Sequence, residues 1–203
     1  MILVVEDNPT IRLLIKKGLE KEGFEVVDVE NGEAALEVIK DRVPELIVSD
    51  VMMPRMDGFQ LVKEIRKKFE NPLLPFIFLT VKDEVDDYIK GYELGADDYL
   101  TKPFDMEKLL DKVKRRLKKA SILKKISTGE VKEASLEDLN ILDIIELSRA
   151  TGRRLEIEVE VEGERGKVVV EKGEVVESKI GDREGKSASS YIMTLKMGKV
   201  YIK

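Results

Sequence analysis

The sequence of 203 residues contains no cysteine and no histidine, and these two absences exclude several classes of chemistry. Without cysteine, the chain has no disulfide bond, no thiolate nucleophile and no thiolate zinc site. Without histidine, it has no Ser-His-Asp triad, no imidazole base and no phosphohistidine of its own. Any chemistry must therefore use carboxylates, hydroxyls, lysine amines or a metal ion bound through oxygen atoms.

The sequence also lacks a long apolar run and an excess of basic residues. No apolar run approaches the roughly 20 residues that a membrane-spanning helix needs, and the first run, Ile2–Val5, ends at the acidic Glu6 and Asp7. We therefore expect a soluble cytoplasmic protein with neither a secretory signal nor a membrane partner. The formal net charge of −5 argues against nucleic acid as a partner of the whole chain. The frequent Lys and Glu residues favour a thermophilic source.

The first 120 residues alternate short apolar runs with amphipathic helical patterns. The apolar runs are typical of strands buried on both faces, and Asn8-Pro9 is a typical helix start with Asn as the N-cap. We expect strands at 2–5, 24–29, 46–48, 76–79 and 98–100, and helices from Pro9 to about Leu19 and at 32–40, 60–69, 83–94 and 105–119. This order predicts an α/β fold, a doubly wound parallel sheet of five strands between two layers of helices.

A different pattern begins after about Ser121. A helix with a broad apolar face is expected at 139–148, with Gly152 as its C-cap. Residues 155–161 alternate strictly between apolar and acidic, which predicts a half-buried antiparallel strand. Glycines at turns then separate further strands at 167–170 and 174–180, followed by a short helix at 187–195 and a last strand at 199–202. The sequence therefore predicts a second, smaller α+β domain that contains antiparallel strands.

Polar side chains gather where the predicted parallel strands end. Glu6 and Asp7 follow the first strand, Asp50 follows the third, Thr80 follows the fourth, and Lys102 comes just past the fifth. Ligands of doubly wound sheets bind at this edge. Three carboxylates brought together repel one another, and a hard divalent cation such as Mg²⁺ removes that repulsion. A carboxylate in such a site can attack phosphorus to form an acyl phosphate, with the metal ion and a lysine neutralising the phosphoryl oxygens.

Three strings of residues around this edge resemble the receiver domain of two-component response regulators. They are Val4-Val5-Glu6-Asp7-Asn8, then Asp50-Val51-Met52-Met53-Pro54-Arg55-Met56-Asp57-Gly58, and Gly95-Ala96-Asp97-Asp98-Tyr99-Leu100-Thr101-Lys102-Pro103-Phe104. The resemblance covers about residues 1–120 and implies a flavodoxin-like receiver fold. It also implies Mg²⁺ as the cofactor and a histidine kinase or phosphotransfer protein as the phosphoryl donor.

The resemblance assigns a role to each residue of the site. Asp50 is implied to be the phosphoacceptor, while Glu6 and Asp7, with Asp50 and the backbone carbonyl of Met52, are implied to bind the metal ion. Thr80 is implied to be the switch hydroxyl and Lys102 the cation that pairs with the phosphoryl group. Two further implied roles follow: Tyr99 is the aromatic switch residue, and Pro103 holds its loop, often through a cis peptide bond in this family.

Two positions depart from the usual receiver pattern. Receivers usually have Ala or Gly after the switch Thr, and Val81 stands there in this chain. Met52, two residues after Asp50, cannot orient a water molecule by hydrogen bonding. We therefore expect slow autodephosphorylation.

The residues after Ser121 do not follow a DNA-binding pattern. A single long helix precedes strands, with no second helix at the spacing of a helix-turn-helix motif and no basic recognition helix. Residues 127–203 instead resemble the PATAN module, named after the N-terminus of PatA, on Gly129-Glu130-Val131, Leu136 to Leu147, Thr151-Gly152, Gly166 to Val176, Gly185 and Gly198-Lys199-Val200-Tyr201-Ile202. Members of that family look like protein-interaction modules, some of them acting on pilus motor ATPases. The resemblance therefore implies a protein as the output partner, with a motility or motor component as one example.

The join between the two domains allows two interpretations. Met106, Leu110, Val113, Leu117 and Ala120 repeat at heptad spacing along the last receiver helix. This face either packs on the receiver sheet or continues through 121–126 and pairs with another chain or with the second module. The second interpretation includes a homodimer that forms on phosphorylation, and the sequence does not decide between the two interpretations.

Taken together, the sequence predicts a response regulator that is not an enzyme beyond its own phosphorylation and dephosphorylation. The receiver is expected at 1–120, a linker or helix extension at 121–126, and the output module at 127–203. The alternative is a transcriptional regulator with an atypical DNA-binding tail, and a third reading is an adaptor whose receiver is never phosphorylated.

Overall fold

The structure is a computed structural model that describes residues 1–68, 73–81 and 97–203. The chain divides into two compact units, Met1–Leu117 and Lys118–Lys203. The helix expected at 83–94 lies outside the described residues. Among the described residues, no helix is long and apolar enough to cross a membrane.

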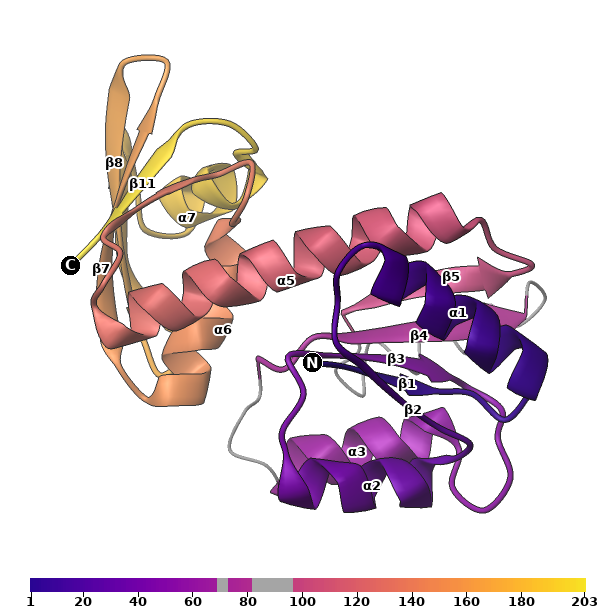
Figure 1. The fold of residues 1–203 in the computed structure, drawn as a ribbon. Helices are drawn as coiled ribbons and strands as arrows, with labels where there is room; N and C mark the ends of the chain where they lie inside the picture. The colour runs from indigo at the N-terminus through magenta and orange to yellow at the C-terminus, as the bar shows by residue number, and fades with distance from the viewer. Residues whose placement is uncertain (69–72, 82–96) are drawn as a thin grey trace. The chain divides into compact units, whose positions relative to one another are not determined.

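The first unit contains a parallel sheet of five strands in the order β2-β1-β3-β4-β5 (Figure 1). Its strands are β1 (Ile2–Val5), β2 (Val26–Val29), β3 (Leu46–Asp50), β4 (Phe76–Val81) and β5 (Asp98–Lys102). The described helices are α1 (Pro9–Lys21), α2 (Gly32–Asp41), α3 (Gly58–Lys68) and α5 (Met106–Thr128), which runs on into the second unit. The expected α/β fold with a doubly wound parallel sheet is confirmed.

Two apolar cores lie on the two faces of this sheet. On one face, Ala35 and Ile39 of α2 and Phe59, Val62 and Ile65 of α3 pack against the strands. On the other face, Ile15 and Leu19 of α1 and Leu109 and Val113 of α5 do so. Because both faces are covered, the strands contain continuous apolar runs rather than alternating apolar and polar residues. Of the heptad positions on α5, Val113 is buried, and Met106, Leu110 and Leu117 pack against this second core, so the first interpretation of that face is supported within the first unit.

Asparagine side chains begin the first two helices, as the sequence indicates for Asn8. The Oδ1 atom of Asn8 accepts hydrogen bonds from the amides of Thr10 and Ile11, and Pro9 occupies the first helical position. Asn31 caps α2 in the same way through the amide of Ala34. The start of α1 therefore lies directly after Glu6 and Asp7, at the carboxyl end of β1.

The second unit contains an antiparallel sheet of six strands in the order β10-β9-β8-β7-β11-β6. Its elements are β6 (Glu133–Ser135), α6 (Ile141–Thr151), β7 (Arg154–Val161), β8 (Glu164–Glu171), β9 (Glu174–Ile180), β10 (Arg183–Glu184), α7 (Gly185–Thr194) and β11 (Lys199–Ile202). The expected α+β domain with antiparallel strands is confirmed, and Gly152 ends α6 in the left-handed conformation at φ 67°. The short strands β6 and β10 were not expected.

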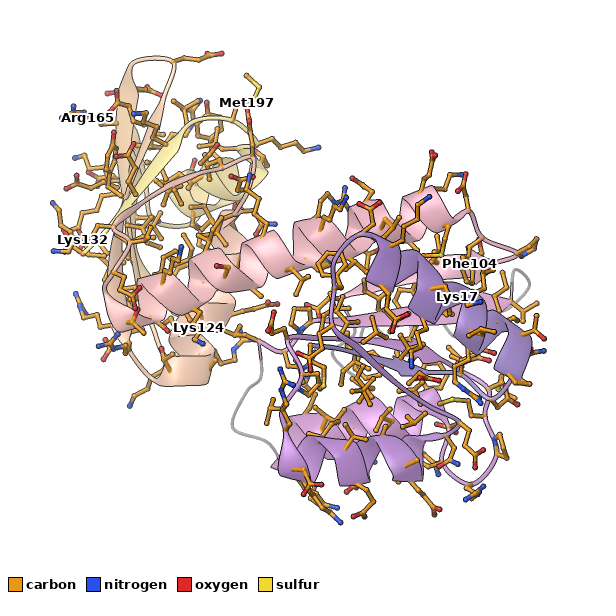
Figure 2. All side chains as sticks on the ribbon, viewed as in Figure 1. Lys17, Phe104, Lys124, Lys132, Arg165 and Met197 are labelled. Carbon is orange, nitrogen blue, oxygen red and sulfur yellow. The ribbon has the colours of Figure 1, made fainter. Side chains whose placement is uncertain are left out.

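Charged side chains occupy the exposed surfaces of both units, and a few large apolar ones accompany them (Figure 2). Lys17 projects from α1, Arg165 from β8, and Met197 from the segment before β11. Met197 is 66% exposed, the largest exposed fraction among the exposed apolar side chains of the described residues. Single exposed apolar residues are ordinary on protein surfaces, so we assign no role to this one.

Candidate functional site

Three carboxylates meet at the carboxyl ends of β1 and β3. Glu6, Asp7 and Asp50 each offer a carboxylate oxygen, and these oxygens all lie within 4.8 Å of one another. Glu6 is fully buried and Asp50 is 7% exposed, whereas Asp7 is exposed. Because the strands are parallel, their carboxyl ends lie at one edge of the sheet and bring together residues that are far apart in the sequence.

Lys102, the last residue of β5, forms ion pairs with two of these acids. Its Nζ atom lies 2.7 Å from Oε2 of Glu6 and 2.8 Å from Oδ2 of Asp50. The Lys102 side chain is 16% exposed, so these ion pairs are largely shielded from water. The predicted cation is therefore beside the predicted phosphoacceptor, and the Lys102–Pro103 peptide bond that follows is cis, as the resemblance implied.

The pKa values of these groups reflect both burial and charge. Burial raises the pKa of the Glu6 carboxyl, and the neighbouring charge of Asp50 adds to this effect, although the hydrogen bond from Lys102 opposes it. Burial alone would lower the pKa of the Lys102 amine, but its hydrogen bonds with Asp50 and Glu6 outweigh burial and raise that pKa. Lys102 is therefore firmly cationic, and the site still concentrates negative charge that one lysine only partly balances.

These residues fit a hard divalent cation. Carboxylate oxygens are the ligands that Mg²⁺ and Ca²⁺ prefer, and the chain has no thiolate or imidazole ligand. Three carboxylates outnumber the one lysine that contacts them, so the site gains from an additional positive charge. Glu6, Asp7 and Asp50 can therefore hold a divalent cation, in agreement with the expectation from the sequence.

The loop after Asp50 is closed by backbone hydrogen bonds. The amide of Val51 donates to Oδ1 of Asp50 at 2.8 Å, and the amide of Gly58 donates to the carbonyl of Val51 at 2.9 Å. A Cβ atom on Gly58 would lie 2.3 Å from the carbonyl oxygen of Asp50, so only glycine fits at this position. Sequence reasoning quoted Gly58 as part of a motif but gave it no role, because the close approach is visible only in three dimensions.

Thr80 and the two unusual residues, Val81 and Met52, lie near the same edge. Thr80 is 1% exposed and precedes the last residue of β4, in register with Thr101 of β5. Val81 is 56% exposed and Met52 is 64% exposed. The two side chains that depart from the receiver pattern are thus both on the surface, where an incoming molecule can contact them.

Tyr99 lies on β5 beside the aromatic residues of the neighbouring strand. Its ring centroid is 5.5 Å from that of Phe78, and it is 6% exposed. Phe78 in turn contacts Phe76 and Phe59, at 4.8 and 5.2 Å between ring centroids. Tyr99 is therefore part of the core on the α2 and α3 face in this structure.

Arg12 holds the loop that carries Glu6 and Asp7, and sequence reasoning missed it. Its Nη1 atom donates to the backbone carbonyl of Glu6 at 2.6 Å and to that of Asp7 at 3.3 Å. Its Nε atom lies 3.3 Å from Oδ2 of Asp28 on β2. The only signal in the sequence is an arginine one helical turn after the cap residue Asn8, and that signal is weak without coordinates.

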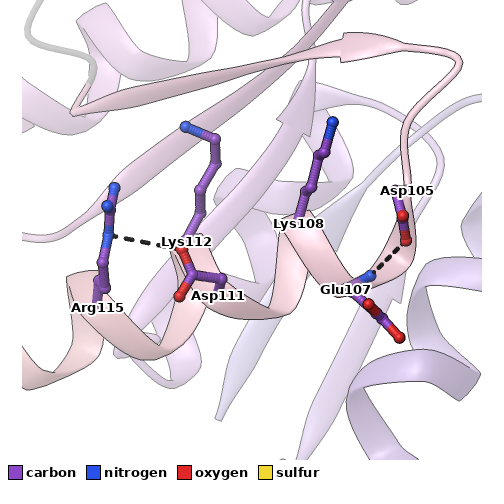
Figure 3. A pocket seen from close by; sticks show the side chains of 6 residues that line it. All are labelled: Asp105, Glu107, Lys108, Asp111, Lys112 and Arg115. Atoms are coloured by element: carbon purple, nitrogen blue, oxygen red, sulfur yellow. Dashed lines mark hydrogen bonds and ion pairs between the residues drawn. The ribbon is translucent and has the colours of Figure 1, made fainter.

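A shallow pocket of about 420 Å³ lies along α5, and none of its lining residues belongs to the acidic site. Figure 3 shows its lining side chains: Asp105, Glu107, Lys108, Asp111, Lys112 and Arg115. Three acids and three bases balance there, Arg115 pairs with Asp111, and Lys112 pairs with Asp98. We interpret this pocket as a charged helix face, since nothing in it favours one kind of ligand.

Comparison with known proteins gives a consistent result for the first unit. The family described as "Response regulator receiver domain" matches residues 2–114. The curated "Alkaline phosphatase synthesis transcriptional regulatory protein PhoP" of Bacillus subtilis is 40% identical over 147 residues. That match covers 70% of this chain and 60% of PhoP, so the chain spans only part of the length of this relative.

Solved structures agree with the family match. The chemotaxis response regulator CheY4 of Vibrio cholerae is 33% identical with a TM-score of 0.54, and the match covers 57% of this chain and 96% of that chain. The receiver domain of a signal transduction histidine kinase from Syntrophus aciditrophicus is 39% identical with a TM-score of 0.54, covering 57% of this chain and 88% of that one. Both matches cover a little more than half of this chain.

Proposed function

Because this chain belongs to the family of response regulator receiver domains, we propose that it accepts a phosphoryl group on Asp50 from a partner histidine kinase or phosphotransfer protein. The observation that carries this proposal is the meeting of Asp50 with two further acids and with Lys102 at one edge of the sheet. We propose that the phosphohistidine belongs to another protein, since these 203 residues contain no histidine.

In the proposed reaction, a carboxylate oxygen of Asp50 attacks the phosphorus of a phosphohistidine. The new O–P bond forms as the P–N bond breaks, and the imidazole nitrogen leaves with the electron pair. Lys102, which lies 2.8 Å from Oδ2 of Asp50, would then pair with the phosphoryl oxygens. The product is an acyl phosphate, and its hydrolysis returns Asp50 to a carboxylate.

We propose Mg²⁺ as the bound cation, held by Glu6, Asp7, Asp50 and the backbone carbonyl of Met52. Once bound, the ion neutralises charge on the acids and on the phosphoryl oxygens. Glu6 is completely buried, so the position of this ligand is fixed before the ion binds. No further catalytic activity is proposed for the chain.

We further propose that Thr80 and Tyr99 carry the signal away from Asp50. The Thr80 hydroxyl would donate a hydrogen bond to the phosphoryl group, and Tyr99 would occupy the space that Thr80 vacates. Both residues are on neighbouring strands, with Thr80 paired to Thr101 two residues after Tyr99. This pairing supports the proposal because a shift at Thr80 acts on the strand that carries Tyr99.

For the second half of the chain, we propose a protein-interaction module of the PATAN type at 127–203, joined to the receiver at 1–120 through 121–126. Residues 121–126 are helical and continue α5. In this proposal the output partner is a protein, with a motility or motor component as the example that the family suggests. A homodimer that depends on phosphorylation remains part of the proposal.

Regulation of transcription is the second candidate function. It is favoured by the match to PhoP, which is described as a transcriptional regulatory protein and whose match covers 70% of this chain. Against it, α6 is followed by strand β7 after two residues, so the described residues 118–203 contain no helix-turn-helix pair. A duplex-binding titration at several salt concentrations separates the two candidates, because DNA binding weakens steeply with salt.

The phosphoacceptor proposal is tested with a small acyl phosphate donor and the purified chain. We expect one phosphoryl group to appear by mass in the wild type with Mg²⁺, and none after chelation of the metal ion or in Asp50→Asn. Asp57→Asn is the matched control, since Asp57 only caps α3 through the amide of Gln60 and asparagine caps equally well. Phosphorylation of Asp50→Asn equal to the wild type would contradict the proposal.

A further inference from the structure

Arg12 contacts the loop between β1 and α1 at two backbone carbonyl groups. Its Nη1 atom donates to the carbonyls of Glu6 and Asp7 at 2.6 and 3.3 Å, and its side chain is only 20% exposed. An arginine that makes short, partly buried hydrogen bonds to two successive carbonyls restricts the rotation of both peptide groups. The two residues restricted in this way are those whose carboxylates join Asp50 in the acidic cluster.

Arg12 is itself held in place from β2. Its Nε atom lies 3.3 Å from Oδ2 of Asp28, while Oδ1 of Asp28 accepts a 2.8 Å hydrogen bond from Nζ of Lys16. Asp28 belongs to the strand that pairs with β1, opposite Val4. Arg12 therefore connects Asp28 on β2 with the loop that follows β1, the strand with which β2 pairs.

Besides the ion pair of its Oε2 atom with Lys102, Glu6 is held by one hydrogen bond at its backbone amide and one at its side chain. Its amide donates to the carbonyl of Val29 at 3.1 Å, and its Oε1 atom accepts from the amide of Asn8 at 3.3 Å. With the carbonyl held by Arg12, the position of Glu6 is fixed at its amide, its carbonyl and its carboxylate. Arg12 supplies the contact to the carbonyl, and it can be replaced without changing the loop sequence or the ion pair between Lys102 and Glu6.

We propose that Arg12 is a positioning residue for the metal-binding carboxylates, acting through the carbonyls of Glu6 and Asp7 rather than by touching the ion. This inference rests on the proposed function, in that it takes the acidic cluster to bind a divalent cation. Residues that orient metal ligands typically change metal affinity about ten- to a hundredfold when they are removed. Arg12→Met should therefore weaken the binding of Mg²⁺ by that factor.

The test uses isothermal titration of the full chain with MgCl₂ at fixed ionic strength. Lys16→Met is the matched control, because it removes the same charge and a partner of the same Asp28 but has no contact with the loop. We expect wild-type affinity in Lys16→Met and an intermediate, several-fold weaker affinity in Arg12→Lys, which keeps the charge but has a single nitrogen donor group. Thermal melting of each variant accompanies the titration.

A second readout needs no metal ion. The carbonyl ¹³C chemical shifts of Glu6 and Asp7 in the metal-free protein report directly on the hydrogen bonds from Arg12. We expect both shifts to move in Arg12→Met, to move partly in Arg12→Lys and to stay in Lys16→Met. A role confined to stability would lower the melting temperature without this pattern.

The outcomes separate the inference from the function on which it rests. No Mg²⁺ binding by the wild type would overturn the proposed metal site itself. Wild-type binding together with equal binding by Arg12→Met would overturn only the inference, as would an equal loss in Arg12→Met and Lys16→Met. If Arg12→Met does not fold, Arg12→Lys decides: wild-type affinity and unchanged carbonyl shifts in that variant contradict the inference.

Discussion

At the scale of single residues, the site contains more negative than positive charge. Glu6, Asp7 and Asp50 lie together, and Lys102 contacts the two that are buried, at 2.7 and 2.8 Å, so one positive charge faces three carboxylates. Burial raises the pKa of the Glu6 carboxyl, and the three acids carry more negative charge than Lys102 balances. This is the physical basis for expecting a divalent cation.

The exposed side chain of Met52 gives a prediction at the same scale. A thioether two residues after Asp50 accepts hydrogen bonds only weakly, so it cannot orient the water that hydrolyses an acyl phosphate. We expect a long phosphoryl lifetime in the wild type and a lifetime up to about tenfold shorter in Met52→Asn, since one hydrogen bond is worth about 1 kcal/mol. The decay of the phosphorylated species is followed by mass after removal of the donor. A wild-type lifetime as short as that of fast chemotaxis receivers would contradict the predicted slow hydrolysis. Met52→Leu is the control.

At the scale of elements, Gly58 connects the start of α3 with the end of β3. A Cβ atom there would lie 2.3 Å from the carbonyl oxygen of Asp50 and 2.8 Å from the Phe78 ring. We expect Gly58→Ala to lower the free energy of unfolding by about 1–3 kcal/mol and to slow phosphorylation of Asp50, because the backbone beside the acceptor must shift. Urea unfolding and the donor assay measure the two effects.

Gly18→Ala is the control for Gly58→Ala. Its Cβ atom would meet only the flexible side chain of Met106, at 2.5 Å from Cε, and alanine favours the helix. The control should lose less stability and phosphorylate at the wild-type rate. Equal effects of the two substitutions would show that the position beside Asp50 has no special role.

Asp98 ties α5 to β5 and gives a prediction about pH. Burial alone would raise the pKa of its carboxyl, but Lys112 at 2.6 Å and Arg116 at 3.1 Å outweigh burial and lower that pKa. Its contribution to stability is therefore complete above its unfolded pKa of about 3.9 and is lost as the pH falls through the lower folded-state pKa.

We expect Asp98→Asn to cost about 2–3 kcal/mol of unfolding free energy at pH 7, because two partly buried cations, Lys112 and Arg116, lose their buried partner. The cost should be the same at pH 5 and shrink only below about pH 3.9. Urea unfolding of both proteins across this range measures it. A cost that already disappears between pH 7 and pH 5 would be incompatible with a lowered pKa.

Much of the fold follows from local patterns, and the differences have physical causes. Strands 46–48, 76–79 and 98–100 were predicted to end before the polar residues, whereas β3, β4 and β5 continue through Asp50, Val81 and Lys102. Their continuation depends on pairing with neighbours, such as Asp50 with Leu79, which a single segment does not reveal. Similarly, β6 and β10 have three and two residues, too few for a periodic pattern.

The residues of the candidate site were easier to predict from the sequence than the residues that hold them in place. Acids at strand ends follow from the order of the elements, so their meeting could be predicted without coordinates. Arg12 and Gly58 act through backbone carbonyl oxygens, and such contacts have no residue pattern of their own. The switching roles of Thr80 and Tyr99 and the phosphate-pairing role of Lys102 stay predictions.

At the scale of the whole molecule, helix α5 contributes to both compact units. Leu109 and Val113 belong to the core of the first unit. After the boundary at Lys118, Lys118 pairs with Asp138 at 2.6 Å and Lys119 pairs with Asp143, which also caps α6. Lys118 and Lys119 are therefore part of the second unit.

The most direct test of a phosphorylation switch compares the whole chain with and without Mg²⁺ and beryllofluoride, a mimic of the phosphoryl group, beside Asp50→Ala. Size-exclusion chromatography and capture of partners from a native lysate are the two readouts. We predict a change in mass or in the captured protein that requires both Mg²⁺ and beryllofluoride and disappears in Asp50→Ala. Identical behaviour in every condition would contradict the account and leave the receiver as a passive scaffold.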